Sequence, residues 1–285
     1  MASNLRLKAL FEVKDRWVAI TGAGSGIGRI LARGCTVNGA NTILIDVNER
    51  SLEETKTELQ ELSRSEDLSP TSVVTEAGVT AVVAAIKSIR GSLDALIHCA
   101  AVRYMNEVTY KPGGSLGDLE DATMSAPYQG WEQTFRLNVL APYYLTAGLV
   151  RPLGTAAAKG DGRGCVLMLS SPASVHNHQF VPCYQTSKAA VDHLVRIMAA
   201  EFADYYIRVN GISPGIVPSG MTTTDANSNL HLAAEAPAGR AGNEDDMVGT
   251  MLWLISKAGA FMDGKVVRVE GGRLLILRGA TCHSG

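Results

Sequence analysis

The chain has 285 residues, of which 46% are hydrophobic and 19% charged, as expected for a globular protein with one substantial core. Its 26 Lys and Arg against 28 Asp and Glu give a net charge of −2 without a basic stripe, which argues against a nucleic-acid partner. The charged start and the lack of any run of about 18 apolar residues argue against a signal peptide and a membrane span. We expect a cytoplasmic protein.

The 5 cysteines are widely spaced, odd in number and without a C-x-x-C pair. This pattern favours neither a disulfide framework nor a zinc site. We expect reduced, mostly buried thiols and no bound metal; the cysteines are Cys35, Cys99, Cys165, Cys183 and Cys282.

Short apolar runs of strand type alternate with helical patterns along the chain. In chain order, strands are predicted at 17–20, 42–46, 72–75, 93–99, 165–170, 207–212 and 266–269. A helix is predicted between the fifth and sixth strands, because apolar residues recur there at helical spacing: Val191, Leu194, Val195, Met198 and Phe202. The fold class predicted is α/β: a single Rossmann-type domain over residues 1–285, a doubly wound parallel sheet of about seven strands with helices on both faces.

Three stretches interrupt this alternation. The polar residues 61–71 predict a surface loop, and 102–130 carry Pro112-Gly113-Gly114, which rules out one long helix. Residues 215–243 predict a mobile loop. The last two follow predicted strand ends, where open α/β sheets bind ligands.

The stretch TGAGSGIG at 21–28 follows the first predicted strand directly. A strand, a glycine-rich turn and a helix let backbone N–H groups approach a pyrophosphate. The alternative is a purely structural turn. The predicted cofactor residues here are Gly22, Gly24, Ser25, Gly26, Ile27 and Gly28.

Asp46 ends the second predicted strand, where a dinucleotide site needs a carboxylate for the ribose hydroxyls. That carboxylate and the uncharged Val47 favour NAD. Arg29 and Arg50 are close enough to Asp46 in sequence that one of them could bind a 2′-phosphate, so NADP remains an alternative. The alternative reading makes Asp46 the N-cap of the next helix.

Tyr184 and Lys188 are spaced i, i+4, so a helix would place both on one face. A tyrosine pKa of about 10 must fall by roughly three units for proton exchange near neutral pH. One cation about 4 Å away contributes about that much at an effective dielectric constant of about 20. We therefore predict Tyr184 as general acid or base, Lys188 as the cation, and Ser171, at the end of the fifth strand, as the donor to the substrate oxygen.

In these motifs the chain resembles the short-chain dehydrogenase/reductase family over roughly residues 11 to 275. The resemblance implies hydride transfer between a nicotinamide cofactor and a ketone or secondary alcohol, with Ser171, Tyr184 and Lys188 as catalytic residues. Asn138 resembles the family's fourth catalytic residue, whose carbonyl holds a water in a proton relay. The segment around 213–216 resembles the family's stretch beside the nicotinamide: Pro214, Gly215 and Ile216.

A narrower resemblance rests on PSGMT and PAGRAGNEDDM, which are similar to fungal reductases of secondary metabolism that are like 3-oxoacyl carrier-protein reductases. The resemblance also implies a homotetramer, with a dimer as the alternative. The apolar start of the tail, Leu274 to Leu277, fits burial against a neighbouring subunit.

Two positions depart from the family pattern. His98-Cys99-Ala100-Ala101 stands where the family reads Asn-Asn-Ala-Gly, so two amide side chains are lost beside the ribose site, although Ala100 and Ala101 still predict cofactor contact. Gly78 stands where an aspartate commonly lies near the adenine. We expect altered sheet stability or cofactor affinity but intact proton transfer.

The segment between Ala101 and Asn138 is longer than the family usually has and brings several aromatic and Met side chains. It predicts a bulky, largely apolar small-molecule substrate; the alternative is that these side chains pack the insertion against its own domain. The predicted substrate residues are Tyr104, His176, His178 and Met221.

Two further function classes are open at this level. The chain could be a dinucleotide-sensing regulator without turnover, which would have no need of Ser171, Tyr184 and Lys188 together. It could also be a cyclase or isomerase that uses the same acid and base without net redox change.

Overall fold

A computed structural model of the protein describes residues 5–66, 71–74, 78–179, 181–219, 222 and 229–277. A seven-stranded sheet has the order β3-β2-β1-β4-β5-β6-β7, and every neighbouring pair is parallel. This confirms the predicted doubly wound sheet. The strands are β1 (Trp17–Thr21), β2 (Asn41–Ile45), β3 (Thr71–Val74), β4 (Ala95–His98), β5 (Cys165–Leu169), β6 (Arg208–Pro214) and β7 (Val266–Val269).

The strand boundaries lie close to those predicted, and the differences have local causes. β4 begins at Ala95 rather than Leu93; the main-chain N–H of Leu93 donates to the Pro152 carbonyl and not to a neighbouring strand. β6 continues past Ile212 to Pro214 because it pairs with β7 up to that residue. The central strands β4 and β5 are mostly apolar and buried on both faces, as a parallel sheet covered by helices requires.

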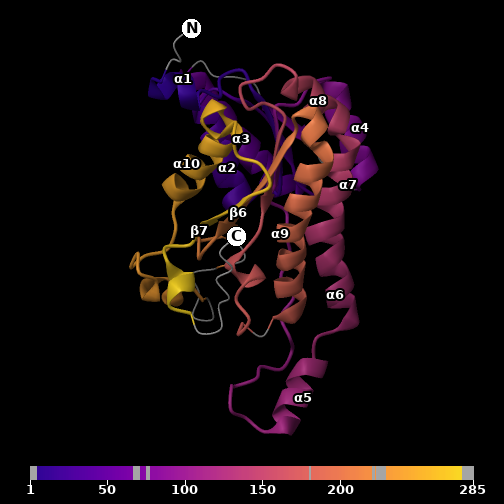
Figure 1. The fold of residues 1–285 in the computed structure, drawn as a ribbon, viewed down its shortest axis with the longest axis vertical. Coiled ribbons are helices and arrows are strands. Elements are labelled where there is room, and N and C mark those ends of the chain that lie inside the picture. The colour runs from indigo at the N-terminus through magenta and orange to yellow at the C-terminus, as the bar shows by residue number, and fades with distance from the viewer. Residues whose placement is uncertain are drawn as a thin grey trace.

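Helices cover both faces of the sheet (Figure 1). The α-helices are α1 (Leu7–Phe11), α2 (Gly26–Val37), α3 (Glu49–Glu66), α4 (Val79–Ile89), α5 (Leu116–Met124), α6 (Tyr128–Phe135), α7 (Ala141–Gly148), α8 (Val150–Ala157), α9 (Pro182–Phe202) and α10 (Glu244–Ile255). A π-helical turn, η1 (Arg136–Leu140), joins α6 to α7. Short 3₁₀ segments are η2 (Pro172–Ser174), η3 (Ala203–Tyr205), η4 (Asn229–Glu235), η5 (Lys257–Gly259) and η6 (Arg273–Leu275).

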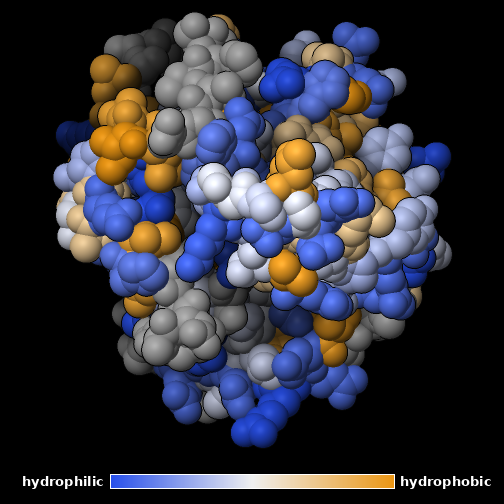
Figure 2. Space-filling model, turned by 90° about the horizontal axis from the view of Figure 1, so that it is seen from below, coloured by the Kyte–Doolittle hydropathy of each residue, from blue (hydrophilic) through white to orange (hydrophobic). Residues whose placement is uncertain are grey.

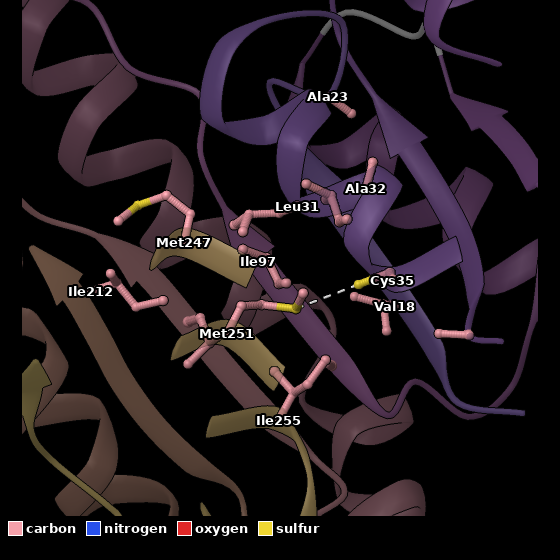
Figure 3. Packing of buried hydrophobic residues seen from close by; sticks show 14 of the residues in the cluster. Val18, Ala23, Leu31, Ala32, Cys35, Ile97, Ile212, Met247, Met251 and Ile255 are labelled. Carbon is pink, nitrogen blue, oxygen red and sulfur yellow. Dashed lines mark hydrogen bonds between the residues drawn. The ribbon is translucent and has the colours of Figure 1, made fainter. Parts of the chain in front are cut away.

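The core is divided by the sheet into two clusters. Val18 and Ile20 of β1 face α2, α3 and α10, whereas Ala19 between them faces α4 and α7 to α9. Figure 3 shows the first cluster, where the Cys35 thiol of α2 lies 3.5 Å from the Met251 sulfur of α10. Alternate side chains of one strand thus fasten both helical layers to the sheet.

The prediction of a surface loop at 61–71 is wrong for most of its length. α3 continues to Glu66, and β3 begins at Thr71. The helical spacing of Leu52 and Leu59, both fully buried, extends to Leu62, which packs against the same cluster. Apolar contacts thus hold the last turns of α3 in spite of the surrounding polar residues.

The 102–130 segment contains α5 and the start of α6, separated by a short turn, so it is not one long helix. A capping box starts α5: the Ser115 hydroxyl accepts from the Asp118 N–H, and the Asp118 carboxylate accepts from the Ser115 N–H. In Figure 1, α5 projects from the lower end of the molecule, away from the sheet. Figure 2 views the molecule from that side and shows separate hydrophobic groups among hydrophilic ones.

The later segment, 215–243, is described at 215–219, 222 and 229–243. Its helical part, η4, is fastened to the C-terminal segment, since the Arg273 guanidinium donates to the Leu232 carbonyl. Within the described ranges, none of the helices combines the length and apolar character needed to cross a bilayer.

Candidate active site

The glycine turn after β1 is packed so tightly that side chains would not fit. A Cβ on Gly28 would lie 2.1 Å from the Gly22 carbonyl oxygen, and one on Gly22, whose φ is +68°, would lie 2.8 Å from the Ala100 nitrogen. α2 begins at Gly26 with neither a capping side chain nor an acidic residue in its first turn. Its N-terminal N–H groups therefore have no carboxylate of their own, which fits a phosphate.

Asp46 follows β2 and lies against this turn. Its Oδ2 accepts from the Gly24 N–H at 3.0 Å, and its Oδ1 accepts from the Asn48 N–H at 3.0 Å. Asn48, not Asp46, caps α3, because its Oδ1 accepts from the Ser51 N–H at 3.1 Å. The alternative that makes Asp46 the helix cap is therefore wrong. Val47 beside it is 81% exposed.

Arg29 and Arg50, the two cations that could bind the 2′-phosphate of NADP, both have carboxylate partners on α3. Arg29 lies 2.6 Å from Glu58, and Arg50 lies 3.1 Å from Glu54. Each guanidinium is thus balanced by a negative charge on the helix that follows Asp46.

The departure at the end of β4 has a structural explanation. His98 is buried and its Nε2 lies 2.9 Å from the Thr146 hydroxyl on α7. Burial lowers the pKa of His98 to about 3, so the ring is neutral at physiological pH. The next two N–H groups, of Cys99 and Ala100, both donate to the Thr21 hydroxyl. The turn beside the glycines is therefore held without the amide side chains that the family pattern has there.

Gly78, the other departure, has a φ of +93° and precedes α4 without a side-chain cap. An aspartate would be strained in this backbone conformation. The positive φ at this position therefore favours glycine over aspartate.

Tyr184 lies in the first turn of α9, two residues after Pro182 at the helix start. Its phenol is hydrogen-bonded to the Ser171 hydroxyl, which directly follows β5. Burial raises the pKa of Tyr184, while the Ser171 hydrogen bond and the positive charge of Arg103 act in the opposite direction. Besides Lys188, which the sequence predicts as the cation for Tyr184, Arg103 is thus a second positive charge acting on the phenol, and the sequence alone did not predict it.

Lys188 is buried one turn further along α9 and donates to the Leu169 carbonyl at 2.6 Å. Its ammonium nitrogen lies 5.6 Å from the centre of the Tyr184 ring. Burial lowers the pKa of Lys188 to about 8, against the opposing effects of Cys99 and Asp192. The predicted pair thus shares one face of α9 at the carboxyl end of β5.

Asn138 is buried within the π-helical turn η1. Its amide oxygen accepts from the Val102 N–H, and its amide nitrogen donates to the Val102 carbonyl, both at 2.9 Å; the same nitrogen donates to Ser187 at 3.1 Å. The side chain thereby fastens the segment after β4 to α9. Single π-turns inside helices are frequent at functional sites.

Beyond the sheet edge, the Gly215 N–H donates to the Val269 carbonyl at 2.8 Å. A Cβ on Gly215 would lie 2.7 Å from the Cα of Glu270, so only glycine fits between β6 and the end of β7. A small cavity of about 70 Å³ adjoins this point, lined by residues that include Gly215, Ile216 and Arg273. The predicted Pro214–Ile216 segment therefore lies at the same edge as Ser171.

The predicted substrate residues differ in their surroundings. Tyr104 is 38% exposed and donates to Gln133 at 2.6 Å. His176 is 8% exposed, and its carbonyl accepts from Gln185, whereas His178 is exposed. Met221 lies outside the described residues.

The apolar side chains of the insertion that lie on α5 and α6 point largely to solvent: Met124 is 77% and Tyr128 80% exposed. Trp131 stacks on Phe135 of the same helix, with ring centres 6.3 Å apart. Met124 and Tyr128 therefore pack little against the rest of the protein.

The cysteines in the described part of the chain are free thiols: Cys35, Cys99, Cys165 and Cys183. Cys183 adjoins Tyr184 but is buried, and its thiol donates to the Tyr104 carbonyl. Across the described ranges, no three His, Cys, Asp or Glu side chains are grouped as a metal site would need.

Sequence reasoning missed three residues of this site. Thr21, the residue just before the glycines, holds the turn after β4, and Arg103 acts on Tyr184. Asp192 accepts a hydrogen bond from Ser170. Only Asp192 had a usable sequence signal, since it continues the spacing of Tyr184 and Lys188 by one more turn.

A family model described as enoyl-(acyl carrier protein) reductase matches residues 22–273. The chain is 32% identical over 283 residues to the short-chain dehydrogenase/reductase PhomF' of Diaporthe leptostromiformis, covering 94% of each protein. The chain belongs to the short-chain dehydrogenase/reductase family. As a member of that family it is an oxidoreductase that acts on CH–OH or C=O groups.

Other relatives extend the likeness to structure. The chain is 30% identical over 266 residues to the rhamnolipids biosynthesis 3-oxoacyl-[acyl-carrier-protein] reductase of Pseudomonas aeruginosa, covering 92% of this chain and 97% of that protein. The Pseudomonas aeruginosa RhlG/NADP active-site complex superposes with a TM-score of 0.78 at 26% identity, covering 93% and 98% of the two chains. These likenesses confirm the predicted family and fold.

Proposed function

We propose that the protein transfers hydride between a nicotinamide cofactor and a ketone or secondary alcohol, with Tyr184 as the general acid or base. The observation that carries this proposal is that Tyr184, Ser171 and Lys188 lie together at the carboxyl end of β5, with the Tyr184 phenol hydrogen-bonded to Ser171 and the Lys188 ammonium near the Tyr184 ring. That edge also holds the glycine turn. An open α/β sheet binds its ligands there.

The residues at the glycine turn fit a dinucleotide. The N-terminus of α2 would hold the pyrophosphate, and Asp46 would accept from the ribose hydroxyls. When bound, the nicotinamide supplies or accepts the hydride. Further residues proposed to contact the cofactor are Ser25, Ile27, Val47, Ala100, Ala101, Pro214, Gly215 and Ile216, with Tyr184 and Lys188.

In reduction, the Tyr184 phenol gives its proton to the substrate oxygen, and in oxidation the phenolate takes the proton back. Ser171, already bonded to that phenol, donates to the same oxygen and orients it. Lys188 places a positive charge beneath the Tyr184 ring, which favours the phenolate. We assign Asn138 to the path by which protons reach Lys188. The Asn138 side chain bonds to Val102 and to Ser187, and Ser187 is the residue directly before Lys188.

We propose NAD as the preferred cofactor. Asp46 would repel a 2′-phosphate, and the two arginines that could offset it, Arg29 and Arg50, are already paired with glutamates. Calorimetric titration with NADH and NADPH tests this: we expect tighter binding of NADH by at least about tenfold, or about 1.4 kcal/mol. Asp46→Ala should narrow that ratio. Tighter binding of NADPH would contradict the proposal.

We propose a bulky, largely apolar substrate, as in secondary metabolism. Tyr104 and Met105, which follow Arg103 out of β4, expose 38% and 52% of their surface, and the Tyr104 carbonyl accepts from the thiol of Cys183, the residue before Tyr184. The relatives differ on this point, because one is named for rhamnolipid biosynthesis and another is named 5-keto-D-gluconate 5-reductase. A panel of ketones, followed by cofactor consumption, should give the highest kcat/KM with large apolar ketones; a preference for keto-sugar acids would refute the proposal.

A further inference from the structure

Three consecutive residues at the end of β5 contact one face of α9. Lys188 donates to the Leu169 carbonyl at 2.6 Å, and the Ser171 hydroxyl is bonded to the Tyr184 phenol. The residue between them, Ser170, also reaches this face. The contact of Ser170 with α9 thus lies between two contacts that involve the proposed catalytic residues Lys188 and Ser171.

The Ser170 hydroxyl donates a hydrogen bond to the Asp192 carboxylate. Asp192 lies one turn beyond Lys188, so Tyr184, Lys188 and Asp192 are aligned at intervals of four residues. The main chain of Ser170 is held separately, since its N–H donates to the Ile212 carbonyl of β6 at 2.8 Å. Both the backbone and the side chain that precede Ser171 are thus constrained.

Asp192 also acts on Lys188 through its charge. The charged or titratable groups that face the buried Lys188 ammonium are Cys99 from the end of β4 and Asp192 and Tyr184 from α9. Burial lowers the pKa of Lys188 to about 8, and the negative charge of Asp192 opposes that effect. A carboxylate near a buried lysine favours the ammonium form.

We infer that Asp192 is a positioning residue for the reaction: it holds Ser170, and through it Ser171, and it keeps Lys188 as the ammonium. This inference rests on the proposed function. Its two effects separate experimentally, because an amide at position 192 still accepts the Ser170 hydroxyl but carries no charge.

Asp192→Asn tests the charge. Removal of a negative charge lowers the pKa of both Lys188 and Tyr184, so the alkaline limb of the kcat/KM profile for ketone reduction should move to lower pH. The plateau should stay within about threefold of wild type, because the hydrogen bond remains. Glu201→Gln is the matched control, since it removes an exposed carboxylate from the same helix and should leave the limb in place. A limb that coincides in the wild type and Asp192→Asn overturns the inference.

Ser170→Ala tests the positioning of Ser171. It removes the hydroxyl that joins β5 to Asp192, so kcat should fall about tenfold while the alkaline limb stays in place. Circular dichroism and thermal unfolding establish that the variant is folded. An unchanged kcat in the folded variant overturns the positioning role.

A measurement without turnover separates this inference from the proposed function. In protein labelled with ¹³C-lysine, the Cε signal of Lys188, identified by its loss in Lys188→Arg, should titrate at lower pH in Asp192→Asn than in wild type or Glu201→Gln. If that shift is seen but no ketone is reduced with either nicotinamide cofactor, the charge effect is supported and the proposed function fails. If the titration is unchanged, the inference fails whatever the activity.

Discussion

The Tyr184 hydroxyl is the single group on which the proposed chemistry depends most directly. Tyr184→Phe removes the proton donor but keeps the ring that Lys188 approaches, so kcat should fall by about a thousandfold while NADH binding by calorimetry stays near wild type. Hydride transfer at the wild-type rate would remove Tyr184 from the mechanism. Product formation by the wild type without cofactor consumption would favour a cyclase or isomerase instead.

At the same scale, the buried His98 makes stability depend on pH. Burial lowers its pKa from 6.5 to about 3, so the unfolded chain binds a proton that the folded chain excludes. The stabilisation from this group is complete above about pH 6.5 and is lost as the pH falls towards 3; by pH 5 the loss is about 2 kcal/mol. His98→Asn, the family's residue, should flatten this dependence in denaturant unfolding at pH 5 and 7. An equal loss of unfolding free energy between pH 7 and pH 5 in the wild type and in His98→Asn would contradict the assignment of this pH dependence to His98.

At the scale of elements, Arg208 joins β6 to the segments around it. Its guanidinium, 7% exposed, donates to the carbonyls of four residues at 2.7 to 2.9 Å: Gly162, Leu254, Gly259 and Met262. Arg208→Met would leave these carbonyls without the donor and should reduce the free energy of unfolding by about 3 kcal/mol. Arg268→Met, on the exposed side of β7, is the control and should stay within about 0.5 kcal/mol of wild type in urea titration. Equal losses in both variants would show that the carbonyl contacts contribute little.

At the scale of the whole molecule, we propose a homotetramer, as the family resemblance implies. Apolar side chains on the surface of η1, α7 and α9 remain uncovered in the single chain: Leu140 is 47%, Tyr144 58% and Ile197 39% exposed. Tyr144→Glu should shift the species seen by sedimentation velocity to lower mass, because a charge in a buried interface is costly. Leu116→Glu on the projecting α5, where the wild-type residue is 85% exposed, should leave the assembly unchanged. A monomeric wild type would overturn the proposal.

Local pattern in the sequence determined the strands, their alternation with helices, the glycine turn and the Tyr184–Lys188 pair, because each depends on residues only a few positions apart. It failed at 61–66, where polar composition concealed the helical spacing that Leu59 and Leu62 continue. It also left open whether Asp46 caps a helix.

Only the tertiary structure decided which distant groups meet. The bond of His98 to Thr146, the clamp of Asn138 on Val102 and the contact of Asp192 with Ser170 join residues from different elements. No periodicity predicts such contacts, because they arise from how parallel strands and their crossover helices pack. Packing around Lys188 also decides its proton affinity, since burial lowers its pKa and Asp192 opposes that effect.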